Sequence, residues 1–170
     1  EEQVAALGTA QLAALTTAQL VKMETADLAA LTTAKITALK TAQMAALTTD
    51  QIVALSEEQV AALGTAQLAA LTTAQLISME TADIAAITTA QITALKAAQI
   101  AALTTPQVVA LTTDQISKLT TSQLIRLTTA QIATMETDDL IALSTSQIRS
   151  LTTTQLPYLT SAQISSLETV

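Results

Sequence analysis

The chain has 170 residues, of which 50% are hydrophobic but only 1% aromatic, and it contains neither His nor Cys. Seven Lys and Arg stand against fourteen Asp and Glu, which gives a formal net charge of −7, and the basic residues are scattered. This composition excludes disulfide bonds and metal–thiolate sites, and it argues against nucleic-acid binding, which needs a clustered basic footprint.

The sequence repeats every eight residues from one end to the other. Thr65–Thr72, reading TAQLAALT, represents the repeat, and the positions of Leu68 and Leu71 hold a large aliphatic residue in every octad. Small residues lie between these two columns, and a Thr pair such as Thr72–Thr73 fills most junctions. Gln occupies the position before the first column except in four octads, which hold Asp27, Lys35, Asp83 and Asp139.

These residues favour helix, but not one continuous helix. Ala, Leu and Gln are strong helix formers, and the two aliphatic columns lie three residues apart, which is a helical spacing. Eight residues rotate a helix by two turns plus roughly 80°, so the aliphatic stripe would spiral around it. Supercoiling absorbs the ~20° drift of a heptad but not four times that. The helix must therefore be interrupted once per octad.

The junction residues supply the interruption. Thr is a favoured N-cap, and Thr72 with Gln75 and Ser56 with Gln59 have the spacing of a capping box. On the same argument we expect the change Thr73→Ala to remove a cap. Pro106 falls in a first turn, where a proline is tolerated. We therefore predict an all-α solenoid of short Thr-capped helices, one per eight-residue repeat.

The size of the aliphatic side chains suggests how many helices form one coil. Three per coil leave too little room for two large side chains from each, and seven leave a hollow tube, whereas about four pack at normal protein density. We expect the Ala pairs at the contact between coils, with Thr and Gln outside or at corners. The alternative is a β-solenoid, because Thr and Ile favour strands; against it stand the spacing of three, the abundant Ala and only two Gly.

A longer period of seven octads overlies the single octad. Residues 1–56 and 57–112 share most positions, and the same register continues through 113–168. We predict a single octapeptide-repeat solenoid over 1–170, built from these three blocks, because repeats of this kind indicate stacked arrays. The last block has diverged, and its Pro157 falls inside a predicted helical turn. The chain also starts and stops within the register, as expected of a segment of something longer.

Acidic residues recur at one place in each block. They are Glu24 and Asp27, Glu80 and Asp83, and Glu136 and Asp139 with Asp138 beside them. If one block forms a whole number of coils, these carboxylates stack in a column and are weak candidates for binding Ca²⁺. The alternative interpretation is N-terminal helix charge copied by duplication. We predict no metal site, no cofactor and no catalytic residues, since no paired groups for nucleophilic or acid–base chemistry recur.

The run Leu71–Gln75, LTTAQ, with its recurrence along the whole chain, resembles the Leu-Thr-Thr-Ala-Gln octapeptide-repeat regions of very large bacterial surface and haemagglutinin-like proteins. The resemblance implies a structural or adhesive context at the cell surface or outside the cell, without an active site. Leu103–Leu111 is also similar to the helix opening of TAL-effector DNA-binding repeats, but the base-reading loops of those repeats are absent.

These observations predict a structural segment rather than an enzyme. We expect a spacer, stalk or self-stacking filament element of a larger secreted or cell-surface protein, associating end to end. The alternative is a binding solenoid whose Thr/Gln outer face contacts a protein, a glycan or ice. No nucleic-acid partner is expected, and no membrane insertion, because no apolar run approaches the ~18 residues of a membrane span.

Overall fold

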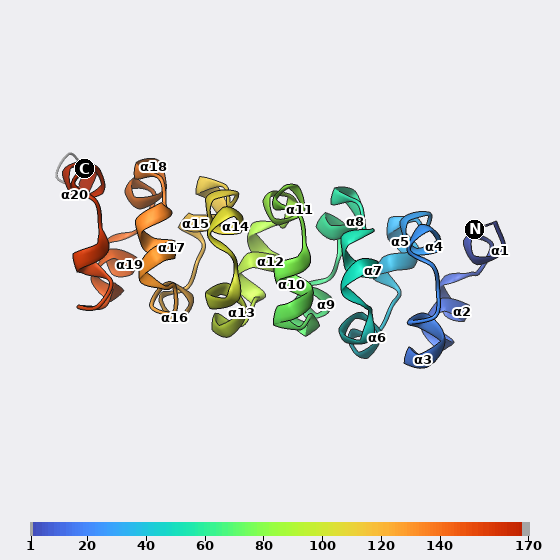
Figure 1. Ribbon diagram of the computed structural model, residues 1–170. Helices are drawn as coiled ribbons and strands as arrows, with labels where there is room; N and C mark the ends of the chain where they lie inside the picture. Colours follow the sequence, from blue (N-terminus) through green and yellow to red (C-terminus); the bar gives the residue numbers. More distant parts are fainter. Residues whose placement is uncertain (1, 168–170) are drawn as a thin grey trace. The chain divides into compact units, whose positions relative to one another are not determined.

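The computed structural model describes residues 2–167, and throughout this range the chain is helical, without strands (Figure 1). The predicted all-α class is confirmed, and the β-solenoid alternative is wrong. Every octad of the described range contributes one short helix. The helices are α1 (Glu2–Ala5), α2 (Thr9–Ala14), α3 (Thr17–Leu20), α4 (Thr25–Ala29), α5 (Thr33–Thr37), α6 (Thr41–Ala46), α7 (Thr49–Val53), α8 (Glu57–Ala62), α9 (Thr65–Ala70), α10 (Thr73–Ser78), α11 (Thr81–Ala86), α12 (Thr89–Ala94), α13 (Ala97–Ala102), α14 (Thr105–Val109), α15 (Thr113–Ser117), α16 (Thr121–Leu124), α17 (Thr129–Thr134), α18 (Thr137–Ile141), α19 (Thr145–Ser150), the 3₁₀ helix η1 (Leu156–Tyr158) and α20 (Ser161–Leu167).

The corner between two helices consists of extended residues. After α9, Leu71 has φ −57° and ψ 143°, and Thr72 has φ −72° and ψ 160°. These angles are close to polyproline II, so the chain leaves one helix, runs extended for two residues and enters the next in a new direction. No residue of the described chain needs a positive φ at these corners. This explains how the repeat turns with almost no glycine.

The capping prediction is confirmed in detail. The Thr72 hydroxyl accepts the Gln75 N–H at 3.2 Å, and the Gln75 Oε1 accepts the Thr72 N–H at 2.7 Å. Ser56 and Gln59 form the same reciprocal pair. The first Thr of each pair is therefore the cap. The expectation for Thr73 is wrong, because Thr73 is already the first residue of α10.

Both prolines have the effect on their helices that the sequence predicts. Pro106 stands in the first turn of α14, where its missing N–H breaks no intrahelical bond. Pro157 lies within η1, and its octad forms a 3₁₀ turn where the others form α-helix. A proline that cannot donate to the residue four positions earlier accounts for this change.

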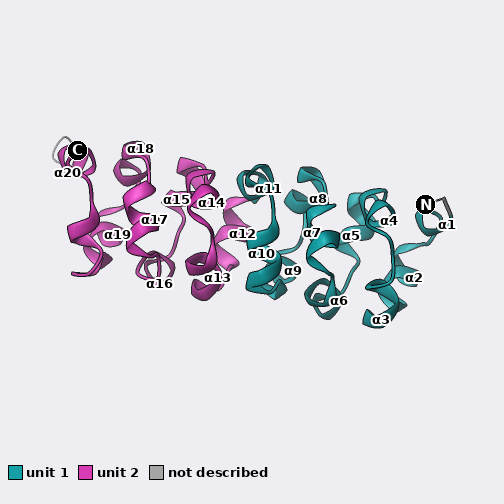
Figure 2. Ribbon diagram, in the orientation of Figure 1, with its two compact units in different colours: residues 1–87 teal, residues 88–170 magenta. Residues whose placement is uncertain are grey.

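The chain divides into two compact units, residues 1–87 and 88–170 (Figure 2). In each unit the short helices wind into successive coils (Figure 1). The boundary falls between α11 and α12 and coincides with none of the block boundaries. The division into blocks 1–56, 57–112 and 113–168 is thus one of sequence, and a single solenoid over 1–170 stays a prediction.

Hydrogen bonds between coils define the coil length. In unit 1, Gln43 on α6 bonds the carbonyls of Leu12 and Leu15, which lie 31 and 28 residues earlier, while α6 also packs on α3 and α9. In unit 2, Gln155 bonds Leu124 and Leu127 at the same two separations. A coil of about 28 residues holds three and a half octads, slightly fewer than the expected four. Each helix packs mainly on the helix three octads before it, as α10 does on α7, while its glutamine reaches carbonyls at the end of the helix four octads before it.

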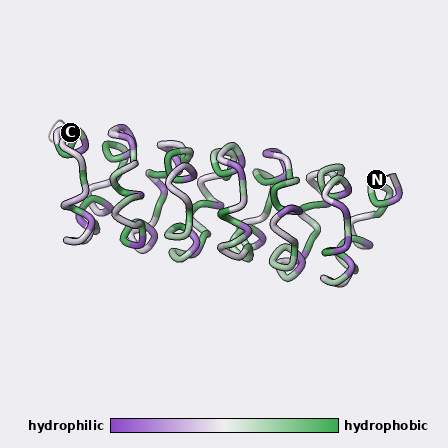
Figure 3. Tube along the Cα trace, viewed as in Figure 1, coloured by the Kyte–Doolittle hydropathy of each residue, from purple (hydrophilic) through white to green (hydrophobic). Residues whose placement is uncertain are grey.

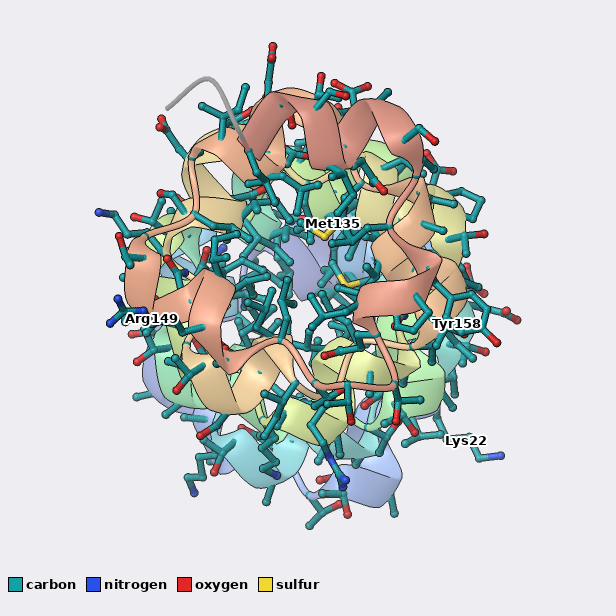
Figure 4. All side chains as sticks on the ribbon, turned by 90° about the vertical axis from the view of Figure 1, so that its left-hand side faces the viewer. Lys22, Met135, Arg149 and Tyr158 are labelled. Atoms are coloured by element: carbon teal, nitrogen blue, oxygen red, sulfur yellow. The ribbon has the colours of Figure 1, made fainter. Side chains whose placement is uncertain are left out.

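The two aliphatic columns form the core of each unit. The first-column residues are fully buried over most of the described chain, and the second column is only slightly more exposed, as with Leu71 at 3%. Figure 4 shows Met135 inside the ring of helices, whereas Arg149 and Tyr158 point outward. In Figure 3, hydrophobic and hydrophilic segments alternate along every coil. Side chains from both sides of each coil thus fill the interior, as predicted.

The expected position of glutamine is wrong. Gln43, Gln75 and Gln123 are between 2% and 3% exposed, as buried as the leucines, whereas the Ala pair Ala69–Ala70 is partly exposed. Gln is the third residue of its helix, and from there its side chain turns back over its own N-cap toward the coil beneath. The contact between coils therefore involves glutamine, and the outer face carries mainly Thr.

Candidate functional site: a buried glutamine ladder

One glutamine side chain connects three parts of the chain. The Gln75 Oε1 accepts the N–H of its own N-cap, Thr72, at 2.7 Å. Its Nε2 donates to the carbonyl oxygens of Met44 at 2.9 Å and Leu47 at 2.7 Å, one coil below. The amide thereby uses both N–H groups, and the side chain is 3% exposed. We call this arrangement a rung, and the series of rungs the glutamine ladder.

Rungs recur through both units, and most have acceptors 31 and 28 residues earlier in the chain. In unit 1 the donors, each with its two carbonyl acceptors, are Gln43 (Leu12, Leu15), Gln51 (Leu20, Met23), Gln59 (Leu28, Leu31), Gln67 (Ile36, Leu39) and Gln75 (Met44, Leu47). In unit 2 they are Gln123 (Ile92, Leu95), Gln155 (Leu124, Leu127) and Gln163 (Ile132, Met135), and Gln131 and Gln147 bond the carbonyls of Leu103 and Leu119.

The glutamine ladder provides hydrogen-bond donors for the carbonyl groups at the ends of very short helices. The last carbonyls of any helix have no partner within the helix, and in a helix of six residues these are most of its carbonyls. A rung supplies a donor to the carbonyl of the corner residue, such as Leu47, and a second donor to a carbonyl of the last turn, such as Met44, which also accepts the Leu47 N–H. Within the described chain no buried side-chain nitrogen or oxygen lacks a hydrogen-bond partner. The ladder therefore satisfies the helix ends and fixes the register of one coil on the next.

Three rung positions of the described chain show what a different residue does. Lys35 keeps a donor, because its Nζ bonds the carbonyl of Ala5 in the first coil. Asp83 forms only the capping bond of a rung, in which its Oδ2 accepts the Glu80 N–H at 3.2 Å. Asp139 accepts the Glu136 N–H at 3.3 Å and the Thr113 hydroxyl at 3.0 Å. An ionised carboxylate has no proton to donate to carbonyls below it, so these two rungs are incomplete.

Burial raises the pKa of both carboxyl groups. For Asp83 the loss of hydration is the largest cause of the raised pKa, and the charges of Glu80 and Glu57 raise it further. The hydrogen bond from the Glu80 N–H lowers the pKa and so opposes them. For Asp139 burial again leads, opposed by the bonds from Thr113 and Glu136, while the charges of Glu136 and Asp138 raise the pKa further. Burial and the neighbouring negative charges both disfavour the charged form of these carboxyl groups.

Asp83 also lines a hollow of about 290 Å³ in unit 1, together with Leu55, Ser56, Glu57, Glu58, Glu80 and Ala82. Glu57 and Glu58 come from α8, which packs on α11. Comparison of sequence positions one block apart does not reveal this neighbourhood, because its residues lie about one coil apart in the chain. Once the coil length is known, comparing residues one coil apart identifies this acidic neighbourhood.

The candidate cation ligands do not gather. Asp27 and Asp83 lie one block apart in unit 1, which is two coils, so a whole coil separates them by roughly 16–20 Å at ordinary helix packing distances. In the part of the chain that the structure describes, no three Asp or Glu residues could hold one metal ion. The same holds for the other candidate ligands, which belong to no such group of three among the described residues: Glu24, Glu80, Glu136 and Asp139. Each acidic pair instead lies at the start of its own helix, α4, α11 or α18.

The family comparison agrees with the seven-octad period of the sequence. The model of the ALTTAQ repeat matches residues 20–57, 76–113 and 132–169, and successive matches start one block apart. These matches cover more than half of the chain, which therefore belongs to the ALTTAQ repeat family. No curated protein matches the chain. Among the described residues, no helix has both the length and the hydrophobicity to cross a membrane.

Proposed function

We propose that this chain is a structural segment, a spacer or stalk within a larger secreted or cell-surface protein. The glutamine ladder is the observation that carries the proposal. In each unit the glutamine side chains join one coil to the next through hydrogen bonds to backbone carbonyls. The strongest interactions of the octad therefore serve to build and hold a stack.

The dependence of the end-to-end distance on the number of blocks tests the spacer proposal. We would attach donor and acceptor dyes before residue 1 and after residue 170, and add one or two extra copies of residues 57–112. A spacer predicts that the distance between the dyes grows by equal increments with each block. A distance that does not change with block number would contradict the proposal.

The cellular location has its own test. An antibody raised against the whole chain should label intact cells that produce the parent protein, without permeabilisation. Labelling that requires permeabilised cells would contradict a surface location while leaving the spacer proposal to the distance measurement. The matched control is an antibody against a cytoplasmic protein of the same cells, which should label only after permeabilisation.

A further inference from the structure

Unit 2 carries its basic residues along one side. Lys96 precedes α13, Arg126 follows α16 and Arg149 lies in the last turn of α19, and all three side chains are exposed. These helices stack in successive coils, because α13 packs on α16 and α16 packs on α19. The exposed Lys118 lies beside them, since the carbonyls on either side of it accept bonds from Gln147 of α19. We call Lys96, Arg126 and Arg149 the basic row.

The described acidic residues of unit 2 lie on a different side. Asp114, Glu136, Asp138 and Asp139 stand at the starts of α15 and α18, which pack on each other. Figure 1 shows α13 and α16 along the lower edge of this unit and α18 along its upper edge. A helix dipole favours acidic residues at helix starts, but every helix has such a dipole. The dipole therefore does not explain why the two signs of charge lie on different stacks of helices.

Unit 1 carries a row of the opposite sign. Glu24 precedes α4, Glu57 opens α8 and Glu80 precedes α11, and all three side chains are exposed. They lie in successive coils, because α8 packs on α11 and Gln59 of α8 bonds two carbonyls of α4. Figure 1 shows α4, α8 and α11 along one edge of this unit. We call these three glutamates the acidic row, near which Lys22 is an exception in sign.

The two rows have nearly the same spacing. By residue number, successive members of the basic row are 30 and 23 residues apart, and those of the acidic row are 33 and 23 apart. Each interval is close to one coil, and coils lie roughly 8–10 Å apart at ordinary helix packing distances. Among the described residues, none of the six side chains forms an ion pair. Three unpaired charges of one sign can therefore meet three of the other sign without a change of backbone.

We propose that the basic row of one copy binds the acidic row of a second copy, with the two chains side by side and running in the same direction. This direction pairs the longer interval of one row with the longer interval of the other. Both rows lie along the sides of their units, so repeats before or after them leave the rows accessible. Each copy keeps one row free after the contact forms, so association can continue sideways. The proposal goes beyond the spacer role and does not depend on it.

Reversal of the basic row tests the contact. In sedimentation velocity at low salt, the parent should associate across a concentration series, and the association should weaken as salt rises, because salt screens opposite charges. The reversed variant should associate about tenfold more weakly or not at all, since three attractions become repulsions. Its changes are Lys96→Glu, Arg126→Glu and Arg149→Glu. A control that keeps the charges should associate like the parent: Lys96→Arg, Arg126→Lys and Arg149→Lys.

Reversal of the acidic row separates matched rows from overall charge. The changes Glu24→Lys, Glu57→Lys and Glu80→Lys bring the formal net charge of −7 close to zero, which by itself favours association. The proposal expects the opposite result, an association about tenfold weaker than that of the parent. Lysine is already present at the N-cap positions of α6 and α13, so these changes suit helix starts.

A chain with both rows reversed completes the test. Its rows again have opposite signs, so its association should return to that of the parent. Far-UV circular dichroism checks that each variant keeps the helicity of the parent, and a reversal that lowers helicity is replaced by Gln at the same positions. A parent that stays monomeric at low salt, an acidic-row variant that associates more strongly than the parent, or a doubly reversed chain that stays monomeric would overturn the proposal. The dye-distance measurement is made on dilute monomers, so the spacer proposal stands or falls separately.

Discussion

At the scale of the residue, glutamine is the side chain that fits a rung. It needs an acceptor for its own cap and two donors for the coil below, and an amide offers both on one planar group. Glutamate lacks the donors, and aspartate is shorter by one carbon as well. The Asp83 carboxylate shows the result, because its bond to the cap N–H is 3.2 Å long where that of Gln75 is 2.7 Å.

Substitutions at one rung should separate the ladder from the cap. We expect Gln75→Ala to lower the free energy of unfolding by about 2–4 kcal/mol, because the Leu47 carbonyl and the Thr72 N–H lose their partner and the Met44 carbonyl keeps only the Leu47 N–H. Thr72→Ala removes only the hydroxyl of the cap and should cost about 0.5–2 kcal/mol. Chemical denaturation of both variants measures the difference. Equal costs would show that the bonds between coils contribute nothing beyond capping.

The carboxylates at rung positions give the stability a pH dependence of known sign. Burial raises the pKa of Asp83 and Asp139 in the folded chain. Their stabilising contribution is therefore fully present below the unfolded pKa of about 3.9 and is lost as pH rises through the folded pKa. Asp83→Asn with Asp139→Asn should flatten this part of the curve of unfolding free energy against pH. Asp50→Asn, at an exposed position outside the rungs, should leave its slope in place.

Completing an incomplete rung should stabilise the chain. Asp83→Gln restores the side chain found at the other rungs of unit 1 and removes a buried carboxylate. We expect a gain of about 1–3 kcal/mol in the free energy of unfolding at neutral pH, from two added hydrogen bonds. The control is Thr81→Gln, an exposed change in the same helix. Thermal or urea unfolding that shows no gain for Asp83→Gln would mean that the Leu55 carbonyl does not need a donor from the next coil and that the Ile52 carbonyl gains nothing beyond the Leu55 N–H.

At the scale of the element, the sequence predicts almost all of the local structure. The ~80° mismatch of an octad with a continuous helix requires one break per repeat, and the caps at Ser56 and Thr72 have the predicted partners. The direction of the Gln side chain could not be predicted in this way. Gln is compatible with an exposed helix position by propensity alone, and its burial depends on which carbonyls lie one coil away. That information exists only once the coil length is known.

The helices should depend on the core far more than on any single corner. Leu71 is 3% exposed and lies in the extended corner between α9 and α10. Leu71→Ala should therefore cost about 2–5 kcal/mol, because the coil cannot collapse fully onto the space that is left. Thr73→Ala, at an exposed first helical position, should cost far less. Denaturant melts of the two variants compare them directly, and similar costs would contradict the assignment of the second column to the core.

At the scale of the whole chain, two periods must agree. The octad fixes which residue faces inward, and the coil of about 28 residues fixes which residue lies beneath which. Three and a half octads make one coil, so an octad returns to the same side of a unit only after two coils, or seven octads. This explains why the longer sequence period is one block of seven octads. The sequence shows that period directly, but the half-octad stagger that produces it requires the bonds between coils.

Deletions of different length should reveal which period the fold depends on. Removing residues 57–112 deletes seven octads and two coils, so every remaining glutamine meets the same kind of carbonyl. We expect this shorter chain to fold with helicity per residue close to that of the parent. Removing residues 57–84 deletes one coil but three and a half octads, so at the joint each rung glutamine lies over another octad position and the aliphatic columns fall out of phase. This variant should show lower unfolding free energy and early loss of helicity near the joint, measured by circular dichroism and hydrogen exchange. If both deletions were tolerated equally, stacking would not depend on the ladder register.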